Sequence, residues 1–195
     1  MADSSSLDLA QPAVLSAGIA PSAASDANAI TLTAFDRHAT ALVRYARSFG
    51  LTEEEAEDVA QDTFLALFKH LSLGREATNL SGWLFRVAHN LAIKKHRTMQ
   101  RRPAHCSWDD TQLHTHTDSR QNPEVHLLER ERRRRIGRVV AALRDRDRRC
   151  LLLRAEGLPY RDIARIVGVS LGGVAKSLAR VMTRLAAVME GQADV

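Results

Sequence analysis

Residues 160–184 read YRDIARIVGVSLGGVAKSLARVMTR, and their pattern predicts a helix-turn-helix. Gly168 interrupts the apolar periodicity at the place of the turn, where a residue that tolerates positive φ is useful. Ser170 comes shortly after it and is a candidate N-cap, because its hydroxyl can accept a bond from an unpaired backbone N–H. The second helix places a buried stripe at i, i+4, i+7 and i+11, formed by Val174, Leu178, Val181 and Leu185.

The other face of this second helix is polar and basic, with Lys176, Ser177, Arg180, Thr183 and Arg184. A helix with one apolar and one basic face fits the DNA major groove, because its cations meet phosphates and its first turns reach base edges. A helical hairpin with a merely solvated charged face is the alternative. We favour DNA binding, because Ala164, Gly168 and Val174 match the tight-turn geometry.

The composition and the distribution of charge narrow the class of protein. The chain has 195 residues, of which 45% are hydrophobic and only 5% aromatic, which is typical of one or two mostly helical domains. Its formal net charge of +5 indicates a polyanion as a partner. Residues 51–70 contain six acidic side chains, whereas residues 81–102 contain six lysines and arginines and no acid. Because a solvated surface normally mixes the two signs, this separation indicates two different partners.

The cysteine content and the N-terminus indicate where the protein works. Cys106 and Cys150 are too few and too far apart for a disulfide framework, which fits a reducing cytosol. The sequence contains no run of 18 apolar residues, so it predicts no transmembrane helix. The first basic residue is Arg37, so the chain lacks the basic start of a secretory signal. We therefore expect a cytoplasmic protein without membrane insertion.

The chain divides into four segments. Residues 1–29 are rich in alanine and serine without a lasting period and predict a disordered leader, although alanine also supports transient helix. Residues 30–102 and 124–190 have helical periodicity. Residues 103–123 are polar, bounded by prolines and too long for a loop inside a compact domain. The predicted fold is therefore all-α, with two small helical domains joined by a flexible linker and with no strands.

The helix expected at residues 53–71 has a second stripe besides its apolar one. Thr52 and Glu55 form a capping box at its start, and Ser81 is expected to cap the helix that follows. The second stripe follows i, i+3, i+4 and i+7 and consists of Asp58, Gln61, Asp62 and Leu65. Acidic and amide groups around a leucine suit a basic protein surface, but from spacing alone an ordinary solvated face is favoured.

The next helix is basic along one side, where Arg86, Asn90, Lys94, Arg97 and Arg101 recur. These mostly cationic groups have no nearby counter-charge, and a phosphate backbone would relieve their repulsion through counterion release. Trp83 and Phe85 offer flat surfaces on which an unstacked base could rest, although core packing is the commoner role of such residues. The arginine run at residues 129–135, ERERRRR, is interpreted mainly as the solvated side of a helix.

The sequence shows no sign of a metal, a cofactor or a catalytic group. The segment before residue 123 contains His105, Cys106, His114 and His116, but their spacing fits no usual zinc pattern, so we expect no metal site. No nucleophile–base pair, phosphate-binding glycine loop or carboxylate dyad stands out, so we expect no cofactor and no enzymatic activity.

Taken together, three stretches resemble the sigma-70 family of RNA polymerase sigma factors, in its small extracytoplasmic-function (ECF) group. AEDVAQDTFLALFKHL (56–71) is similar to region 2.2, with its D-x-x-Q-x-x-F pattern at Asp58, Gln61 and Phe64. SGWLFRVAHNLAIKKHR (81–97) is similar to regions 2.3–2.4, and LLLRAEGLPYRDIARIVGVSLGGVAKSLARVMTRL (151–185) is similar to region 4. The resemblance covers roughly residues 30–188 and includes nothing like a region 3 domain.

The resemblance implies partners that spacing alone does not. It implies that the stripe at Asp58, Gln61, Asp62 and Leu65 binds the β′ clamp helices of core RNA polymerase. The basic third helix, with its site residues Trp83, Arg86, Asn90, Lys94, Arg97 and Arg101, would open and hold the −10 element of promoter DNA. The helix-turn-helix would read the −35 element through Ser170, Lys176, Ser177, Arg180 and Arg184 and would also rest on the β flap. An anti-sigma factor is left open as a further partner.

Two departures from the family pattern concern DNA specificity. Lys94 stands where family members usually have an acid, and Gly173-Val174 stands where Thr-Val is common. Two rival functions remain at this point. An autonomous helix-turn-helix regulator would bind duplex DNA alone and would not need the 58–65 surface, and a nucleic-acid-modifying enzyme subunit or adaptor would need a catalytic set that the sequence lacks.

Overall fold

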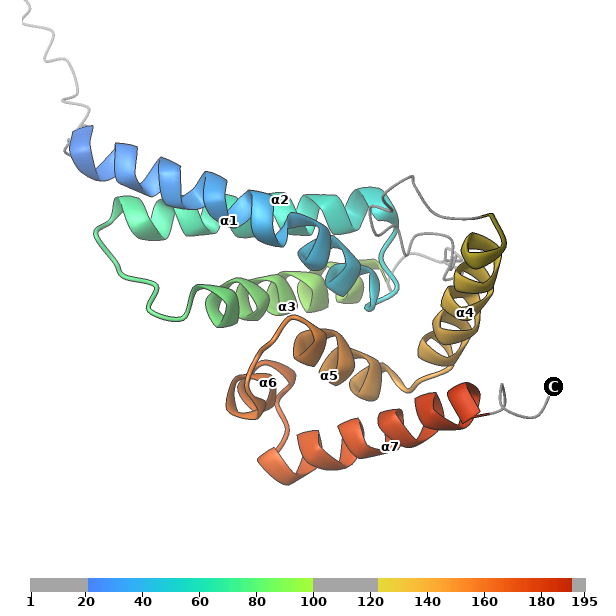
Figure 1. The fold of residues 1–195 in the computed structure, drawn as a ribbon. Helices are drawn as coiled ribbons and strands as arrows, with labels where there is room; N and C mark the ends of the chain where they lie inside the picture. The colour runs from blue at the N-terminus through green and yellow to red at the C-terminus, as the bar shows by residue number, and fades with distance from the viewer. Residues whose placement is uncertain (1–20, 100–122, 191–195) are drawn as a thin grey trace, which may run out of the picture.

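The computed structural model describes residues 21–99 and 123–190, and every regular element in these two ranges is an α-helix (Figure 1). The N-terminal half contains α1 (Pro21–Arg47), α2 (Glu53–Ser72) and α3 (Leu80–Met99). The C-terminal half contains α4 (Pro123–Ala141), α5 (Asp145–Ala155), α6 (Tyr160–Val167) and α7 (Leu171–Glu190). The predicted all-α fold is confirmed for the described residues.

Helices α1, α2 and α3 pack around one aromatic and aliphatic core. The side chains of Leu42, Tyr45, Leu67, Leu84 and Phe85 are fully buried there. The rings of Tyr45 and Phe85 meet edge to face with their centroids 5.5 Å apart, an arrangement that aromatic pairs favour. In Figure 1 α1 and α2 lie side by side and α3 runs beneath them, with α5 and α6 on the other side of α3.

The first helix begins earlier than the sequence analysis expects. Residues 21–29, assigned there to a disordered leader, form the first turns of α1, and that assignment is wrong for them. Alanine has the highest helix propensity, and Ala27 is buried, so this segment has both a local and a packing reason to be helical. Residues 1–20 lie outside the described residues.

The ends of α2 and α3 show which capping predictions hold. The capping box at the start of α2 is confirmed: the Glu55 N–H donates to Thr52 Oγ1 at 3.2 Å, and the Thr52 N–H donates to Glu55 Oε2 at 3.0 Å. The cap predicted for α3 is wrong. The Gly82 N–H donates to Asn79 Oδ1 at 3.0 Å, which makes Asn79 the capping residue, while the Ser81 hydroxyl faces His38.

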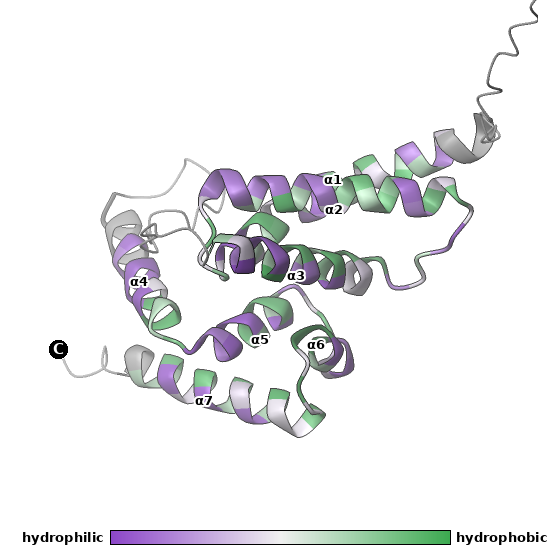
Figure 2. Cartoon of the chain, turned by 180° about the vertical axis from the view of Figure 1, so that it is seen from behind, coloured by the Kyte–Doolittle hydropathy of each residue, from purple (hydrophilic) through white to green (hydrophobic). Residues whose placement is uncertain are grey.

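The C-terminal half has its own core between α5, α6 and α7, while α4 contacts α7. Leu153 of α5, Ile163 of α6 and Val174 with Val181 of α7 are fully buried in it. Figure 2 shows that α7 alternates hydrophobic and hydrophilic residues around its circumference, as an amphipathic helix does.

The two halves are not separate in this structure. Helix α5 contacts α1 and α6 contacts α3, and buried residues of both halves belong to one hydrophobic cluster. The sequence pattern predicted two domains on a flexible linker. Residues 100–122 lie outside the described residues, and α4 begins at Pro123, where the predicted linker ends. The contact between the halves is therefore a feature that the sequence pattern did not predict.

Candidate polymerase and nucleic-acid interfaces

The predicted polymerase-binding stripe lies on the exposed face of α2. Asp58, Gln61 and Asp62 are exposed, and Leu65 has 57% of its surface accessible, although it is a large apolar residue. The opposite face of the same helix is buried, and it includes Phe64 and Leu67. Helix α2 thus has one apolar face in the core and a second, partly apolar face at the exterior. A binding partner can cover this second face.

One member of the stripe is connected to the basic helix. The Lys95 ammonium of α3 donates to Asp58 Oδ2 at 2.7 Å. This pair joins the acidic face of α2 to the basic face of α3, and Lys95 is a residue that the sequence analysis did not single out. Because both side chains remain partly exposed, the ion pair contributes little free energy, and either residue can bind a charged group of a partner instead.

The predicted basic side of α3 is exposed along its described length. Arg86, Asn90, Lys94 and Arg97 all face solvent, while Phe85, Ala88 and Ala92 are buried on the other side. Arg101 lies outside the described residues. The helix contains no acidic residue, so this face has a one-signed charge that attracts a phosphate backbone.

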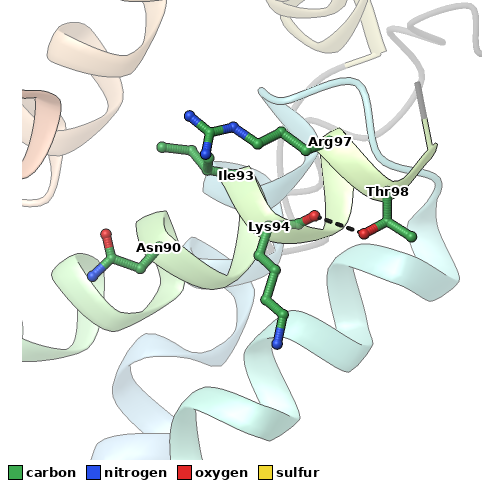
Figure 3. A pocket seen from close by; sticks show the side chains of 5 residues that line it. All are labelled: Asn90, Ile93, Lys94, Arg97 and Thr98. Atoms are coloured by element: carbon green, nitrogen blue, oxygen red, sulfur yellow. Dashed lines mark hydrogen bonds between the residues drawn. The ribbon is translucent and has the colours of Figure 1, made fainter. Parts of the chain in front are cut away.

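An open hollow of about 500 Å³ lies at the C-terminal end of this face, lined by Asn90, Ile93, Lys94, Arg97 and Thr98 (Figure 3). In the close-up, Arg97 folds back along the helix toward Ile93, and Lys94 extends to the opposite side. The Thr98 hydroxyl donates to the Lys94 carbonyl at 3.0 Å. Cations, an amide and one apolar side chain around a hollow suit nucleotides, which present phosphates and flat bases.

Trp83 lies at the start of α3 and is half-buried. Its indole is 5.1 Å from the His70 ring of α2, measured between centroids, and the two planes make an angle of 40°. Phe85, the other aromatic considered for base stacking, is fully buried and packs in the core. Core packing is therefore the role of Phe85, while Trp83 keeps part of its surface at the exterior.

A buried polar pair fixes α3 against α1. The Tyr45 hydroxyl and His89 Nδ1 form a hydrogen bond of 2.7 Å, and both side chains are buried. Burial raises the pKa of Tyr45 above its usual range, and burial together with the charge of Arg149 lowers the pKa of His89 to about 4. The imidazole is therefore neutral at physiological pH, and its hydrogen bond with Tyr45 orients the exposed side of α3.

The helix-turn-helix is confirmed in its geometry. Gly168 ends α6 with φ 73° and ψ 38°, the left-handed conformation that glycine adopts without strain, and its N–H donates to the Ala164 carbonyl at 3.0 Å. The Ser170 hydroxyl accepts from the Gly173 N–H at 3.1 Å, as an N-cap does. Helices α6 and α7 are bent by 101° at this turn.

The structure contradicts the prediction that Ser177 faces outward. Ser177 is fully buried, and it lies next to the apolar stripe around the circumference of α7. Helix α7 packs against both α5 and α6, so its buried arc is wider than the run of apolar residues suggests. Ser177 therefore cannot contact duplex DNA in this structure.

Arg180 also differs from its predicted role as a free base-reading residue. Its guanidinium donates to both carboxylate oxygens of Asp147, at 2.8 and 3.2 Å, and to the Ser177 hydroxyl at 3.3 Å. Burial raises the pKa of the Asp147 carboxyl, but the hydrogen bonds from Arg180 and Ser177 outweigh burial and hold this pKa below its usual range. Arg180 thus ties α7 to α5 while its side chain stays exposed, and Lys176 and Arg184 are exposed on α7 as well, as predicted.

Among the described residues, no three His, Cys, Asp or Glu side chains come together in a group that could hold a metal ion. The candidates His105, Cys106, His114 and His116 lie outside these residues. No single described helix has the length and apolar composition to cross a membrane, and α6 and α7 meet that standard only as a bent pair.

The sequence matches two family descriptions in the order that the fold presents them. Residues 34–102 match Sigma-70 region 2, and residues 133–185 match Sigma-70, region 4. The first match spans the second half of α1 with α2 and α3, and the second includes the helix-turn-helix.

Relatives and solved structures agree with these matches. The chain is similar to the RNA polymerase sigma-H factor of Pseudomonas aeruginosa, with 31% identity over 65% of this chain and 69% of the relative. It is similar to RNA polymerase sigma factor NccH of Alcaligenes xylosoxydans xylosoxydans, with 28% identity over 79% and 83% of the two chains. Among solved structures, it resembles CnrH in complex with the cytosolic domain of CnrY, with a TM-score of 0.53 and 25% identity over 91% of this chain and 97% of that one.

A further solved structure supports the fold alone. The sigma factor RpoE in complex with the anti-sigma factor NepR from Bartonella quintana has a TM-score of 0.57 at 20% identity, covering 84% of this chain and 98% of that one. The presence of region 2 together with region 4 also favours a sigma factor over an autonomous helix-turn-helix regulator. The chain therefore belongs to the ECF group of the sigma-70 family, whose members bind core RNA polymerase and direct it to promoters.

Proposed function

We propose that three separate helices of this sigma factor contact the polymerase clamp, the −10 element and the −35 element. The polymerase stripe (Asp58, Gln61, Asp62 and Leu65 of α2) binds the β′ clamp helices, and the −10 face (Trp83, Arg86, Asn90, Lys94 and Arg97 of α3, with Arg101 beyond it) holds the opened −10 element. The −35 face (Ser170, Lys176 and Arg184 of α7 and its cap) meets −35 duplex, and the region 4 half rests on the β flap. The observation that supports this most is the separation of an exposed acidic face on α2 from an exposed basic face on α3.

The polymerase stripe combines charge with an exposed leucine. Leu65 lies between exposed polar residues on the face of α2 that is turned away from the core. Covering such a side chain gains apolar burial, and the acidic groups around it select a basic partner surface. The resemblance of AEDVAQDTF to region 2.2 supports the β′ clamp helices as that partner.

The −10 face supplies both contacts that an opened strand needs. Lys94 and Arg97 are exposed cations for phosphates, and the half-buried Trp83 has an accessible part for an unstacked base. Asn90 lies between them on the same face, where its amide can bond a base edge. Lys94 adds a positive charge where family members usually have an acid, so we propose a stronger backbone contact here.

The −35 face is smaller than the sequence pattern suggested. Lys176 and Arg184 are exposed on α7, whereas Arg180 is held by Asp147 and acts as a positioning residue. Gly172 has open space where a Cβ would stand, so the first turn of α7 can approach DNA with its backbone. The Gly173 N–H already donates to the Ser170 hydroxyl, so the other N–H groups at the start of α7 would meet a phosphate, as at other helix N-termini.

The domain boundaries and the cellular role complete the proposal. We infer a region 2-like domain over residues 30–102 with α1 extending before it, a region 4-like domain over residues 124–190, and a linker over 103–123. The protein acts in the cytoplasm, performs no covalent chemistry itself and requires no cofactor. An anti-sigma factor is a fitting further partner, because the two similar solved structures are complexes, one with the cytosolic domain of CnrY and one with the anti-sigma factor NepR.

A core-binding assay tests the polymerase stripe. The double variant Asp58→Arg with Gln61→Arg places two cations on the stripe, and we expect it to abolish co-purification with core polymerase and promoter-dependent run-off transcription. Circular dichroism should remain unchanged, because both residues are exposed. The matched control Glu131→Arg reverses an exposed charge on α4, and it should bind core polymerase like the unchanged protein.

The same assay separates the sigma factor from an autonomous regulator. A sigma factor needs core polymerase for specific promoter binding, so the double variant should lose transcription even at saturating DNA. If the double variant binds core polymerase normally, the stripe is a solvated surface and the proposal for α2 is wrong. If the purified chain binds promoter duplex equally well with and without polymerase, the regulator is the better description.

A further inference from the structure

The start of α3 is fixed by the short loop that joins it to α2 (Figure 1). Gly74 turns the chain after α2 with φ 69°, a left-handed conformation that glycine adopts without strain. Asn79 holds the first turn of α3, because its side-chain oxygen accepts from the Gly82 N–H and its carbonyl accepts from the Trp83 N–H at 2.9 Å. The backbone of Trp83 is therefore held by this turn, whereas its side chain is only half-buried.

His70 contacts both the Trp83 side chain and the loop. It lies in the last turn of α2, and its ring centroid is 5.1 Å from that of the indole, with an angle of 40° between the two planes. Its Nε2 donates to the Glu76 carbonyl of the loop at 3.4 Å, at an exposed place. One side chain thus connects the end of α2, the loop and the beginning of α3.

The ring contact is the stronger of the two contacts of His70. Tilted aromatic rings at this separation attract one another beyond the burial of their surfaces. The bond to the Glu76 carbonyl is long and open to water, which replaces it readily. His70 therefore acts on its surroundings mainly through the Trp83 indole.

The place of Trp83 on α3 gives this contact a consequence for DNA. Trp83, Arg86 and Asn90 follow the i, i+3, i+7 spacing of one helix face, so the indole lies at the N-terminal end of the −10 face. A half-exposed tryptophan that rotates freely loses that freedom when a base stacks on it. An indole that a neighbouring ring already holds loses less, so it binds an unstacked base more readily.

We propose that His70 is a positioning residue for promoter opening, whose ring holds the Trp83 indole in the orientation that stacks on an unpaired base of the −10 strand. His70 acts through Trp83 and makes no contact with DNA itself. This inference rests on the proposed function, because it takes Trp83 as a member of the −10 face. It adds a residue of α2, outside the −10 face, to those that determine how readily the promoter opens.

The rate of strand opening by the holoenzyme tests this role. A promoter with 2-aminopurine in the −10 element reports opening, because the fluorescence of this base rises when it is unstacked. His70→Ala removes both contacts and should slow opening by about two- to tenfold, as expected for the loss of one aromatic pair, with core polymerase binding unchanged. A normal opening rate in His70→Ala would overturn the proposal.

Two conservative variants show which contact of His70 matters. His70→Phe keeps a ring beside the indole and should restore most of the opening rate. His70→Gln keeps only a donor for the Glu76 carbonyl and should open the promoter as slowly as His70→Ala. Rescue by glutamine and not by phenylalanine would mean that His70 acts on the loop instead of on Trp83, and the proposal would be wrong.

A double-mutant cycle distinguishes failure of this inference from failure of the proposed function. If His70 acts through Trp83, His70→Ala should slow opening little further in a Trp83→Ala protein. Losses that multiply would show that His70 acts independently of the indole, which overturns the inference and leaves the −10 face as proposed. A normal opening rate in Trp83→Ala alone would remove Trp83 from the −10 face, and the role of His70 would fall with it.

Tryptophan fluorescence of the full-length chain measures the contact without polymerase. The chain has two tryptophans, so Trp108→Phe leaves the Trp83 indole as the only one. In this background His70→Ala should shift the emission to longer wavelength and increase quenching by acrylamide, because water reaches the uncovered part of the indole. The matched control Lys69→Ala shortens the exposed neighbouring side chain and should change neither signal. Emission and quenching that His70→Ala leaves unchanged would show that the ring does not hold the indole.

Discussion

Helices α3 and α7 are both 20 residues long and both present basic residues at their exterior, yet the fold uses the two basic faces differently. On α3, Arg86, Asn90, Lys94 and Arg97 are exposed, as their spacing predicts. On α7, by contrast, Ser177 is buried and Arg180 is bound to Asp147. The comparison shows that periodicity identifies the apolar centre of a helix face, whereas neighbouring helices decide how far burial extends around it.

The difference has a simple structural cause. The basic residues of α3 stay exposed although α1, α2 and α6 all contact this helix. Helix α7 lies across both α5 and α6 and contacts α4 as well, so polar residues at the edge of its apolar stripe meet other helices. Variants at the polar residues of α7 should therefore lower folding stability, whereas variants at the basic residues of α3 should weaken DNA binding.

The largest effect on stability is expected at Asp147, which accepts the hydrogen bonds of Arg180. Asp147→Ala removes the acceptor of two charge-assisted hydrogen bonds and should lower the unfolding free energy of the region 4 half by about 2–3 kcal/mol. Chemical denaturation followed by circular dichroism measures this. The control Asp145→Ala removes an exposed acid of the same helix with only long ion pairs, and it should change stability by less than about 0.5 kcal/mol. Equal effects of the two variants would mean that the Asp147 pair does not stabilise α7.

The second prediction concerns pH and distinguishes the two halves. His89 titrates near pH 6.5 when unfolded and near pH 4 when buried, so the unfolded chain binds more protons between these values. Stability of the α1–α3 half should therefore decrease as the pH falls below about 6.5, by about 2 kcal/mol between pH 7 and pH 5. Helices α5, α6 and α7 contain no histidine, so they lack this contribution.

Denaturation at the two pH values measures the effect of His89. The variant His89→Gln keeps an acceptor for the Tyr45 hydroxyl but does not titrate in this range, so its stability should depend much less on pH. If the variant and the unchanged protein lose the same stability between pH 7 and pH 5, protonation of His89 is not the cause.

The third prediction tests the exposed cations of α3. Replacing Lys94 and Arg97 by alanine should reduce the slope of log K against log salt for promoter binding by the holoenzyme, by about 0.7–0.9 for each phosphate that is no longer neutralised. Folding should be unaffected, because both side chains are exposed. Lys95→Ala is the matched control: this neighbouring lysine is paired with Asp58 and should change the slope less. If Lys95→Ala changed the salt slope as much as Lys94→Ala does alone, Lys94 would have no special role in phosphate binding.

The smallest effect is expected at the first turn of α7. Gly172→Ala places a Cβ in open space and should stabilise α7 by about 0.5–1 kcal/mol, because alanine restricts the unfolded chain more than glycine does. Gly173→Ala should gain less, since its Cβ would stand 3.3 Å from the capping Ser170 hydroxyl. Thermal unfolding of both variants measures this, and a destabilising Gly172→Ala would indicate that the first turn needs glycine for its own geometry.

The amino-acid sequence by itself determined the local features of this protein. The capping box at Thr52 and Glu55, the left-handed turn at Gly168 and the cap at Ser170 follow from neighbouring residues, and all three are present. The exposed stripe on α2 and the basic side of α3 follow from helical periodicity. The family resemblance rests on the same local patterns, because each motif lies within a single helix or a helix pair.

Only the tertiary structure decided which polar groups are taken by other parts of the chain. The bonds of Arg180 to Asp147, Lys95 to Asp58, and Asn79 to Asp162 connect residues that are far apart in sequence, so no periodicity reveals them. The early start of α1 and the contact between the two halves also depend on packing against distant residues. The physical reason is that capping and amphipathic spacing act over one or two helical turns, whereas burial and ion pairing depend on which helices the complete fold brings together.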